Sequence, residues 1–292
     1  MVASQPQYSP KQIADALEVS ESSVKRWCDS GKISSVRTGG GHRRVTLEGL
    51  RRFLSHSSRS LIAPEVLGLP KLDPARSDHH QFDSEDDFKS FNVALSLGDE
   101  AKCREILFRQ AARTSAADAA EKLIHGAMQG IGTAWECSEL DVYQERRACE
   151  ICVRLINQVR RELVVPVDAP VAIGGTPPGD PYQLSSTLAE LSLREAGWNA
   201  INLGSNLPLD SFLQASHDLR PRIAWLSVSS LEDSEAFVAE QNYLAERLDD
   251  EIVLFIGGRA LTDAIRPRLR CTAHCDSIAS MVELAAMLVR PR

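Results

Sequence analysis

Residues 171–204 have the sequence VAIGGTPPGDPYQLSSTLAELSLREAGWNAINLG, in which two structural patterns alternate. A short run of apolar and small residues is stopped by glycine, proline and aspartate, and a stretch with helical period leads to a second short run. Three further runs follow at 222–229, 251–258 and 270–275, and the four intervals between runs and the tail at 277–289 have helical period. This alternation predicts a five-stranded parallel sheet with helices on both faces and ligands at the carboxyl ends of its strands.

The predicted fold is a flavodoxin-like (Rossmann-like) α/β domain, which we assign to residues 166–292. Its first loop lacks the dinucleotide-binding pattern, because no G-x-G-x-x-G spacing is present and the glycines at 174 and 175 stand before two prolines. The loop that leads to Tyr182 is therefore predicted to lie at the ligand-binding edge of the sheet without being a nucleotide site.

Residues 84–165 have helical period throughout and no strand pattern. Candidate helices span 84–97, 99–113, 115–134 and 139–163, and their short connections predict a four-helix bundle. No Ser/His/Asp order, E-x-x-H pair or glycine-rich phosphate loop stands out in this segment. We therefore expect a multidomain α and α/β protein that is not an enzyme, with an enzyme kept as the alternative of a different class.

The charge of the chain is unevenly distributed. Residues 1–60 contain ten Lys and Arg against five Asp and Glu, a formal charge of +5, whereas the remaining 232 residues carry −12. A basic segment on an acidic body is either an ordinary solvated surface or a binding surface for phosphates.

Local patterns in the basic segment favour phosphate binding. Ser9, Pro10 and Gln12 form a capping box at the start of a helix, and Ser20 caps a second helix at 21–30 after a three-residue turn. Two short helices joined so tightly predict a helix-turn-helix, with an inert helical hairpin as the alternative. The outward residues of the second helix are of the kinds that contact phosphates and base edges: Ser22, Ser23, Lys25 and Arg26.

The sequence SSVRTGGGHRRVT at 34–46 has short runs with strand alternation on both sides of a triple glycine. This pattern predicts a two-stranded wing at 36–45. Glycines allow close approach of the backbone to a phosphate, and arginines supply charge and planar donors. The candidate DNA-binding residues of the wing are Arg37, Thr38, Gly40, His42, Arg43 and Arg44. Thr46 then caps a third helix with one apolar face.

These segments together carry a resemblance to a known family. The pattern Y-S-P, A-D-A-L-E-V-S, S-V-K-R-W, G-K-I and R-T-G-G-G-H-R-R resembles the winged helix-turn-helix head of MerR-type and excisionase-type regulators. The resemblance implies that residues 1–56 form a DNA-binding domain whose partner is a double-stranded DNA operator.

Residues 57–83 are rich in Ser, Pro, Asp and His, and we predict a linker with one short apolar anchor at 61–69. His79 and His80 within it are interpreted as solvated rather than metal-binding.

Seven cysteines, an odd number, indicate reduced thiols rather than a disulfide framework. Cys149 and Cys152 form a C-x-x-C without a second pair at zinc-ribbon spacing, so no metal site is predicted. The longest apolar runs are far shorter than the roughly 20 residues of a bilayer crossing, and the N-terminus has no signal pattern. We expect a cytoplasmic protein without a membrane partner.

A helical bundle followed by a flavodoxin-like domain, with a polar motif after the first strand, resembles the cobalamin-binding module of methionine synthase and its relatives. That family carries D-x-H-x-x-G, then S-x-[LT], then G-G. Here residues 180–185, DPYQLS, take the first place; Ser227-Val228-Ser229 follow after 41 residues, and Gly257-Gly258 after 27 more. With the DNA-binding head, the chain resembles the cobalamin-dependent photoreceptor repressors, which hold adenosylcobalamin between bundle and Rossmann-like domain and assemble on operator DNA in the dark.

The departures from this family concern its chemistry. The family's histidine, which an aspartate orients, replaces the lower cobalt ligand, whereas this chain has Asp180 followed by Tyr182, a phenol that is a poor cobalt ligand when neutral. Ser185 replaces the glycine that makes room for the cobalamin tail. The photoreceptor motif W-x9-E-H, whose histidine captures the upper position, becomes Trp135, Glu145 and Arg146.

We therefore predict a DNA-binding transcriptional regulator with a degenerate pocket and no cofactor, its bundle and α/β domain serving as an oligomerisation module. Alternatives are a sensor that binds another flat molecule such as a tetrapyrrole, or cobalamin bound with its own base retained. We also expect a homo-oligomer, a dimer or higher, because one head covers only a half-site. The predicted pocket residues are Trp135, Val142, Glu145, Arg146, Asp180, Tyr182, Ser185, Ser227, Ser229, Gly257 and Gly258.

Overall fold

The computed structural model describes residues 7–38, 41–55, 57, 59, 61–67, 85–128 and 141–288. The chain divides into two compact units. The first unit contains residues 1–74, 170–182 and 203–292, and the second contains residues 75–169 and 183–202. No helix in the described part of the chain is long and apolar enough to cross a membrane.

The N-terminal part of the first unit is a small α/β fold. Its helices are α1 (Pro10–Ala16), α2 (Glu21–Asp29) and α3 (Leu47–Ser55), and its strands are β1 (Gln7–Tyr8), β2 (Ser35–Arg37) and β3 (Arg43–Thr46). The strands form an antiparallel sheet in the order β1-β3-β2. The predicted capping box at α1 is confirmed, since the Ser9 side chain accepts from Gln12 N and the Gln12 side chain accepts from Ser9 N. Strand β1 was not predicted, because two residues are too few to show alternation.

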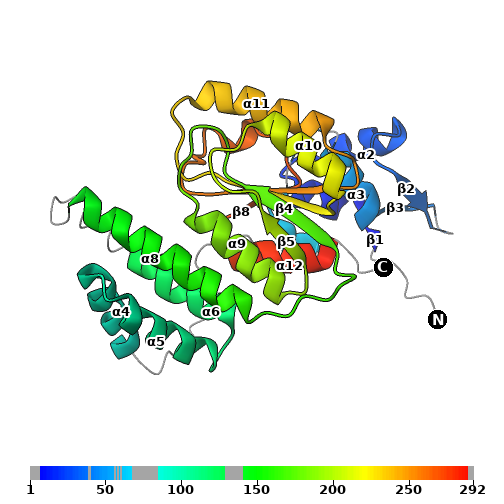
Figure 1. Ribbon diagram of the computed structural model, residues 1–292. Helices are drawn as coiled ribbons and strands as arrows, with labels where there is room; N and C mark the ends of the chain where they lie inside the picture. Colours follow the sequence, from blue (N-terminus) through cyan, green and yellow to red (C-terminus); the bar gives the residue numbers. More distant parts are fainter. Residues whose placement is uncertain are drawn as a thin grey trace. The chain divides into compact units, whose positions relative to one another are not determined.

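The predicted parallel sheet is confirmed. Its strands are β4 (Val171–Gly175), β5 (Asn199–Asn202), β6 (Ile223–Ser227), β7 (Val253–Gly257) and β8 (Ala273–Cys275), in the order β5-β4-β6-β7-β8. In the first unit, α10 (Leu209–Leu219) and α11 (Ser234–Arg247) lie on one face and α12 (Ile278–Leu288) lies on the other (Figure 1).

One of the helical intervals was predicted wrongly. Between β7 and β8 the structure has only a 3-10 turn, η3 (Arg266–Arg268), in place of a helix. Pro267 lies inside this interval and supplies no backbone N–H, so an α-helix through it would lose a hydrogen bond and meet a steric clash.

The second unit contains the helical bundle. Helices α4 (Glu85–Leu97), α5 (Glu100–Ala111) and α6 (Ala116–Ala120) are followed by a π-helical turn, η2 (Glu121–His125), and by α8 (Val142–Arg161). The predicted helix at 115–134 is helical through residue 128, and its last part lies outside the described residues.

Helix α9 (Leu184–Glu195) is joined to the bundle helices by polar contacts. The carboxylate of Glu195 accepts the backbone N–H groups of Ala116 and Ala117 at 2.7 and 3.0 Å, so it caps the N-terminus of α6. Buried Glu190 pairs with Arg160 of α8 at 2.5 Å. Bundle and α9 therefore form one packed body.

In the first unit, the start of the predicted linker lies against both the head and the parallel sheet. Leu61 is buried and pairs with Ala273 of β8 in a parallel bridge. The backbone N–H groups of Ile62 and Ala63 both donate to the carbonyl of Ala16, at the end of α1. The 3-10 turn η1 (Pro64–Leu67) follows.

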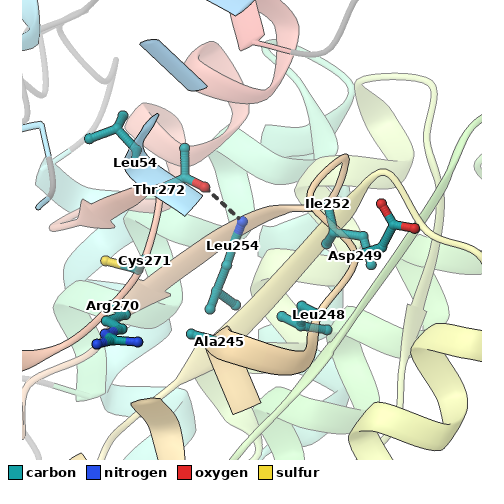
Figure 2. A pocket seen from close by; sticks show the side chains of 9 residues that line it. All are labelled: Leu54, Ala245, Leu248, Asp249, Ile252, Leu254, Arg270, Cys271 and Thr272. Atoms are coloured by element: carbon teal, nitrogen blue, oxygen red, sulfur yellow. Dashed lines mark hydrogen bonds between the residues drawn. The ribbon is translucent and has the colours of Figure 1, made fainter. Parts of the chain in front are cut away.

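Helix α3 also packs beside the sheet, where Leu54 lines a small hollow with residues of α11, β7 and the segment before β8 (Figure 2). Across this hollow the Thr272 hydroxyl accepts the backbone N–H of Leu254 at 3.1 Å. The hollow has a volume of about 20 Å³, room for a single water molecule, so it is a packing feature and not a ligand site.

Candidate functional site

The second helix of the head presents a polar face. Helix α2 starts after Ser20, whose hydroxyl accepts the backbone N–H of Ser23 at 3.2 Å. Val24 is buried, and Trp27 stacks against Phe53 of α3 with 4.8 Å between ring centroids. This packing fixes which side of α2 faces outward.

The predicted contact residues of α2 lie mainly on its outward side. Ser22, Lys25 and Arg26 are exposed, whereas Ser23 is half-buried and its hydroxyl accepts from Arg26 at 3.3 Å. Lys25 is paired with Glu21 at 2.9 Å. The helix thus offers one hydroxyl and two cations to a partner.

The wing residues fall into two groups. Arg37, Thr38 and His42 are exposed around a tight turn in which Thr38 N donates to His42 O at 2.9 Å and Gly41 N donates to Thr38 O at 2.8 Å. Gly41 has φ +77°, which favours glycine. Gly40 lies outside the described residues.

The second group is Arg43 and Arg44, which are half-buried. Arg43 forms an ion pair with Asp29, the last residue of α2, and Arg44 donates to the carbonyl of Arg43 at 3.2 Å. Both arginines were predicted to contact phosphates, and Asp29 was not among the predicted residues. The ion pair with Asp29 shows that the Arg43 side chain connects the wing to α2.

At the carboxyl edge of the parallel sheet, Asp180 joins two loops. Its side chain is fully buried; Oδ2 accepts the backbone N–H groups of Ser229 and Ser230 at 2.6 and 3.2 Å, and Oδ1 accepts that of Tyr182 at 3.0 Å. Thr176 donates to the Asp180 carbonyl at 2.6 Å. The carboxylate therefore holds the loop after β4 against the loop after β6.

Tyr182 is half-buried and lies beside a cation. The guanidinium of Arg259 is 5.4 Å from the centre of the Tyr182 ring, within the range of a cation–π contact, and Arg259 Nε donates to the carbonyl of Ser229 at 3.1 Å. Arg259 was not among the predicted site residues. It follows Gly257-Gly258 directly, so its place in that motif is the feature that could have indicated it.

Two glycines at this edge accommodate close neighbours. Gly174 of β4 pairs in register with Trp225 of β6, and a Cβ added to Gly174 would lie 1.9 Å from Cδ2 of the indole. Gly258 has φ +130°, and a Cβ there would lie 2.2 Å from the carbonyl oxygen of Val228. Trp225 is buried, so the space that Gly174 leaves on this face is filled by the indole ring.

The remaining predicted residues of this edge are Ser227, Ser229 and Gly257, and a Cβ added to Gly257 would lie 2.4 Å from the carbonyl oxygen of Cys275. Ser227, the last residue of β6, is buried, and Ser229 is half-buried in the loop that follows. Gly257 is the last residue of β7, and its carbonyl oxygen accepts a hydrogen bond from the backbone N–H of Val228 at 2.8 Å.

The other predicted pocket residues belong to the second unit. Val142 and Arg146 are exposed at the start of α8, and Arg146 pairs with Glu145 at 3.6 Å. Ser185 is exposed in the first turn of α9. Trp135 lies outside the described residues.

The C-x-x-C of α8 is not arranged as a reactive pair. Burial raises the pKa of Cys149 to about 12, with the nearby carboxylate of Glu145 adding to the effect, and burial also raises the pKa of Cys152. The Cys149 thiol donates to Glu145 at 3.3 Å. Within the ranges that the structure covers, no group of three His, Cys, Asp or Glu side chains is arranged to hold a metal ion.

Two family models match the chain. A helix-turn-helix domain matches residues 8–58, and a B12 binding domain matches residues 88–160. A DNA-binding domain joined to a B12-binding domain fits a DNA-binding regulator with a cobalamin-binding module. No curated protein matches the chain.

Several solved structures match the chain. The monomethylamine corrinoid protein of Methanosarcina barkeri superposes with a TM-score of 0.60 at 18% identity, over 70% of this chain and 99% of that chain. A cobalamin-binding protein from Desulfitobacterium hafniense DCB-2 has a TM-score of 0.37 at 20% identity, over 70% of this chain and 100% of that one. The methanol:cobalamin methyltransferase complex of Methanosarcina barkeri gives 0.38 at 15% identity, over 72% and 82%. At such identities, the first similarity establishes the fold alone.

Proposed function

We propose that this protein is a DNA-binding transcriptional regulator whose C-terminal module is a degenerate cobalamin-binding fold. This module serves in oligomerisation and does not bind cobalamin through a histidine ligand. The observation that carries the proposal is the loop after β4, where Tyr182 lies beside the Arg259 guanidinium and the Asp180 carboxylate is occupied by backbone N–H groups.

The donor set at this loop does not fit a cobalt ligand. A neutral phenol is a poor ligand for cobalt, and a phenolate would require loss of a proton whose ordinary pKa is near 10. In the family that the sequence resembles, the aspartate orients the ligating histidine. Here Asp180 accepts the backbone N–H of Tyr182 and two N–H groups of the loop after β6, so it orients backbone rather than a side-chain ligand.

The sheet topology supports the same conclusion. In a parallel sheet of this order, ligands bind in the crevice between the first and third strands of the sequence, here β4 and β6. Asp180 bridges the two loops that border this crevice, and the Trp225 indole occupies the space above Gly174. The Asp180 carboxylate beside this crevice is therefore already engaged with backbone N–H groups of the chain.

The regulatory role rests on the head. Ser22, Lys25, Arg26, Arg37 and His42 are exposed on one helix-turn-helix domain within a segment of formal charge +5. Exposed cations release counterions when they contact phosphates, and exposed polar groups at a helix surface reach base edges. We propose that two or more copies act together on operator DNA, since one head contacts only a half-site.

Two experiments test the proposal. In the first, the purified full chain selects duplexes from a randomised 30-base-pair library; absence of any enriched sequence would overturn the DNA-binding role. In the second, the protein is mixed with adenosylcobalamin in the dark and passed over a sizing column, with the variant Tyr182→His and a histidine-ligated photoreceptor as comparisons.

We expect the wild-type chain to elute without visible absorption and its oligomeric state to be unaffected by light. Stoichiometric corrinoid with a histidine-type spectrum, or a light-dependent change of assembly, would refute the proposal. Corrinoid with the spectrum of the free base-on cofactor would replace it by the base-on alternative, and a different visible chromophore would replace it by the sensor of another flat ligand.

A further inference from the structure

Asp29 is an acidic residue in an unfavourable place. It is the last residue of α2, and its side chain is 56% exposed. A negative charge at the C-terminus of a helix opposes the helix dipole. If α2 contacts DNA, the same carboxylate is also repelled by phosphates. The Asp29 carboxylate is therefore unfavourable both for the stability of α2 and for DNA binding. Its ion pair with Arg43 is a favourable interaction that can offset these two costs.

We propose that Asp29 is a positioning residue of the DNA interface: it holds the Arg43 guanidinium and thereby fixes the wing against the C-terminal end of α2. This inference rests on the proposed DNA-binding function. Arg43 is the first residue of β3, and its side chain is only 26% exposed because it lies against α2 rather than in solvent.

The strand pairing explains why the wing needs this contact. Strand β1 pairs with β3 only at Val45 and Thr46, next to α3, while the pair Arg37 and Arg43 is the last of the β2–β3 ladder before the tip. In the described part of the head, Asp29 links this outer pair back to the helices. Since Arg37 and His42 extend from the same end of the hairpin, their positions depend on the contact as well.

The hypothesis is tested by two substitutions that remove the same charge from the same helix. Asp29→Asn removes the charge that holds Arg43 and leaves only a neutral amide oxygen, whereas Glu21→Gln removes the carboxylate paired with Lys25 at the opposite end of α2. If only net charge mattered, both variants would bind DNA more tightly than the wild type. If Asp29 positions the wing, Asp29→Asn binds more weakly and Glu21→Gln binds as tightly or more tightly.

The assay is fluorescence anisotropy of full-length protein on a duplex selected by the wild type. We expect Asp29→Asn to weaken binding by about fivefold, the effect of losing one partly exposed ion pair. Asp29→Glu should retain most of the affinity. Arg43→Ala should weaken binding similarly, and the double variant should be no weaker than Arg43→Ala, since both act on one contact.

A second readout separates positioning from a general loss of stability. Hydroxyl-radical footprints of Asp29→Asn should lose protection at the flanks contacted by the wing and keep it where α2 binds, and thermal unfolding should match that of the wild type. Asp29→Asn binding as tightly as Glu21→Gln, with an unchanged footprint, would overturn the inference. Failure of the wild type itself to select any duplex would instead contradict the proposed function.

Discussion

The substitution Asp180→Asn tests whether this carboxylate has become a structural bridge. Asparagine preserves the size of the side chain but has a single oxygen. Its best arrangement turns that oxygen toward Ser229 and Ser230, whose N–H groups lie at 2.6 and 3.2 Å from Oδ2, and turns the amide nitrogen toward the N–H of Tyr182. The backbone N–H of Tyr182 then loses its acceptor, and the hydrogen bonds from Ser229 and Ser230 go to a neutral oxygen in place of a charged one.

The magnitude follows from these losses. A buried donor without a partner costs about 1–3 kcal/mol, and hydrogen bonds to a charged group are roughly twice as strong as neutral ones. We expect the free energy of unfolding to fall by about 2–4 kcal/mol and the midpoint of thermal unfolding to fall by roughly 5–10 °C.

The assay is urea unfolding followed by circular dichroism, with Asp263→Asn as the matched control because Asp263 is exposed in the loop after β7. The control should change stability by less than about 0.5 kcal/mol. An equally small change for Asp180→Asn would refute the bridging role. If Asp180 oriented a cofactor ligand instead, the substitution would alter cofactor affinity and leave the stability of the ligand-free protein almost unchanged.

Four further predictions concern other parts of the molecule. Arg37→Ala should weaken DNA binding on all sequences and reduce the slope of log affinity against log salt by about 0.9, measured by anisotropy; an unchanged slope would exclude a phosphate contact. Glu145→Gln should lower the pKa of Cys149, raised to about 12 by burial and by Glu145, so iodoacetamide should modify that thiol faster at pH 9; an unchanged rate would contradict this coupling. Glu190→Gln should lower the free energy of unfolding by about 2 kcal/mol, since it leaves two arginines without their buried partner; a shift under about 0.5 kcal/mol would show that solvent compensates. Light scattering at micromolar concentration should give a dimer or larger species, and a strict monomer that binds one half-site would count against assembly.

Local patterns in the sequence predicted the parts of the fold that depend on neighbouring residues. Ser9 and Ser20 start helices because a hydroxyl caps the N–H groups two or three positions on, and this geometry is contained in four consecutive residues. The five strands were predicted because each is a short apolar run between breakers. The helix between β7 and β8 was predicted from the helical period of the interval despite Pro267. The structure has only a short 3-10 turn there, so the proline prevailed over the period.

The candidate site was harder to predict from the sequence because its contacts join residues that are far apart in the chain. Asp29 meets Arg43 across 14 residues, and the Asp180 carboxylate meets N–H groups 49 and 50 residues away. Backbone donors have no sequence pattern, so no motif could indicate them. The motif spacing placed Asp180 and Tyr182 at the correct edge of the sheet, but the cation beside the ring came only from the structure.

The bridge between Leu61 and Ala273 bears on how this chain can be cut for experiments. Leu61 covers the outer side of β8, and the carbonyl of Ala16 receives two N–H groups from the next residues. A fragment of the α/β domain that begins after residue 67 would expose a bare sheet edge, which is prone to pair with other chains and aggregate. A head ending before residue 61 would lose two bonds at the end of α1. Exchanging this head for another while preserving solubility therefore requires the foreign sequence to join before Leu61, so that residues 61–67 stay with the α/β domain, or to supply its own apolar residue at the position of Leu61.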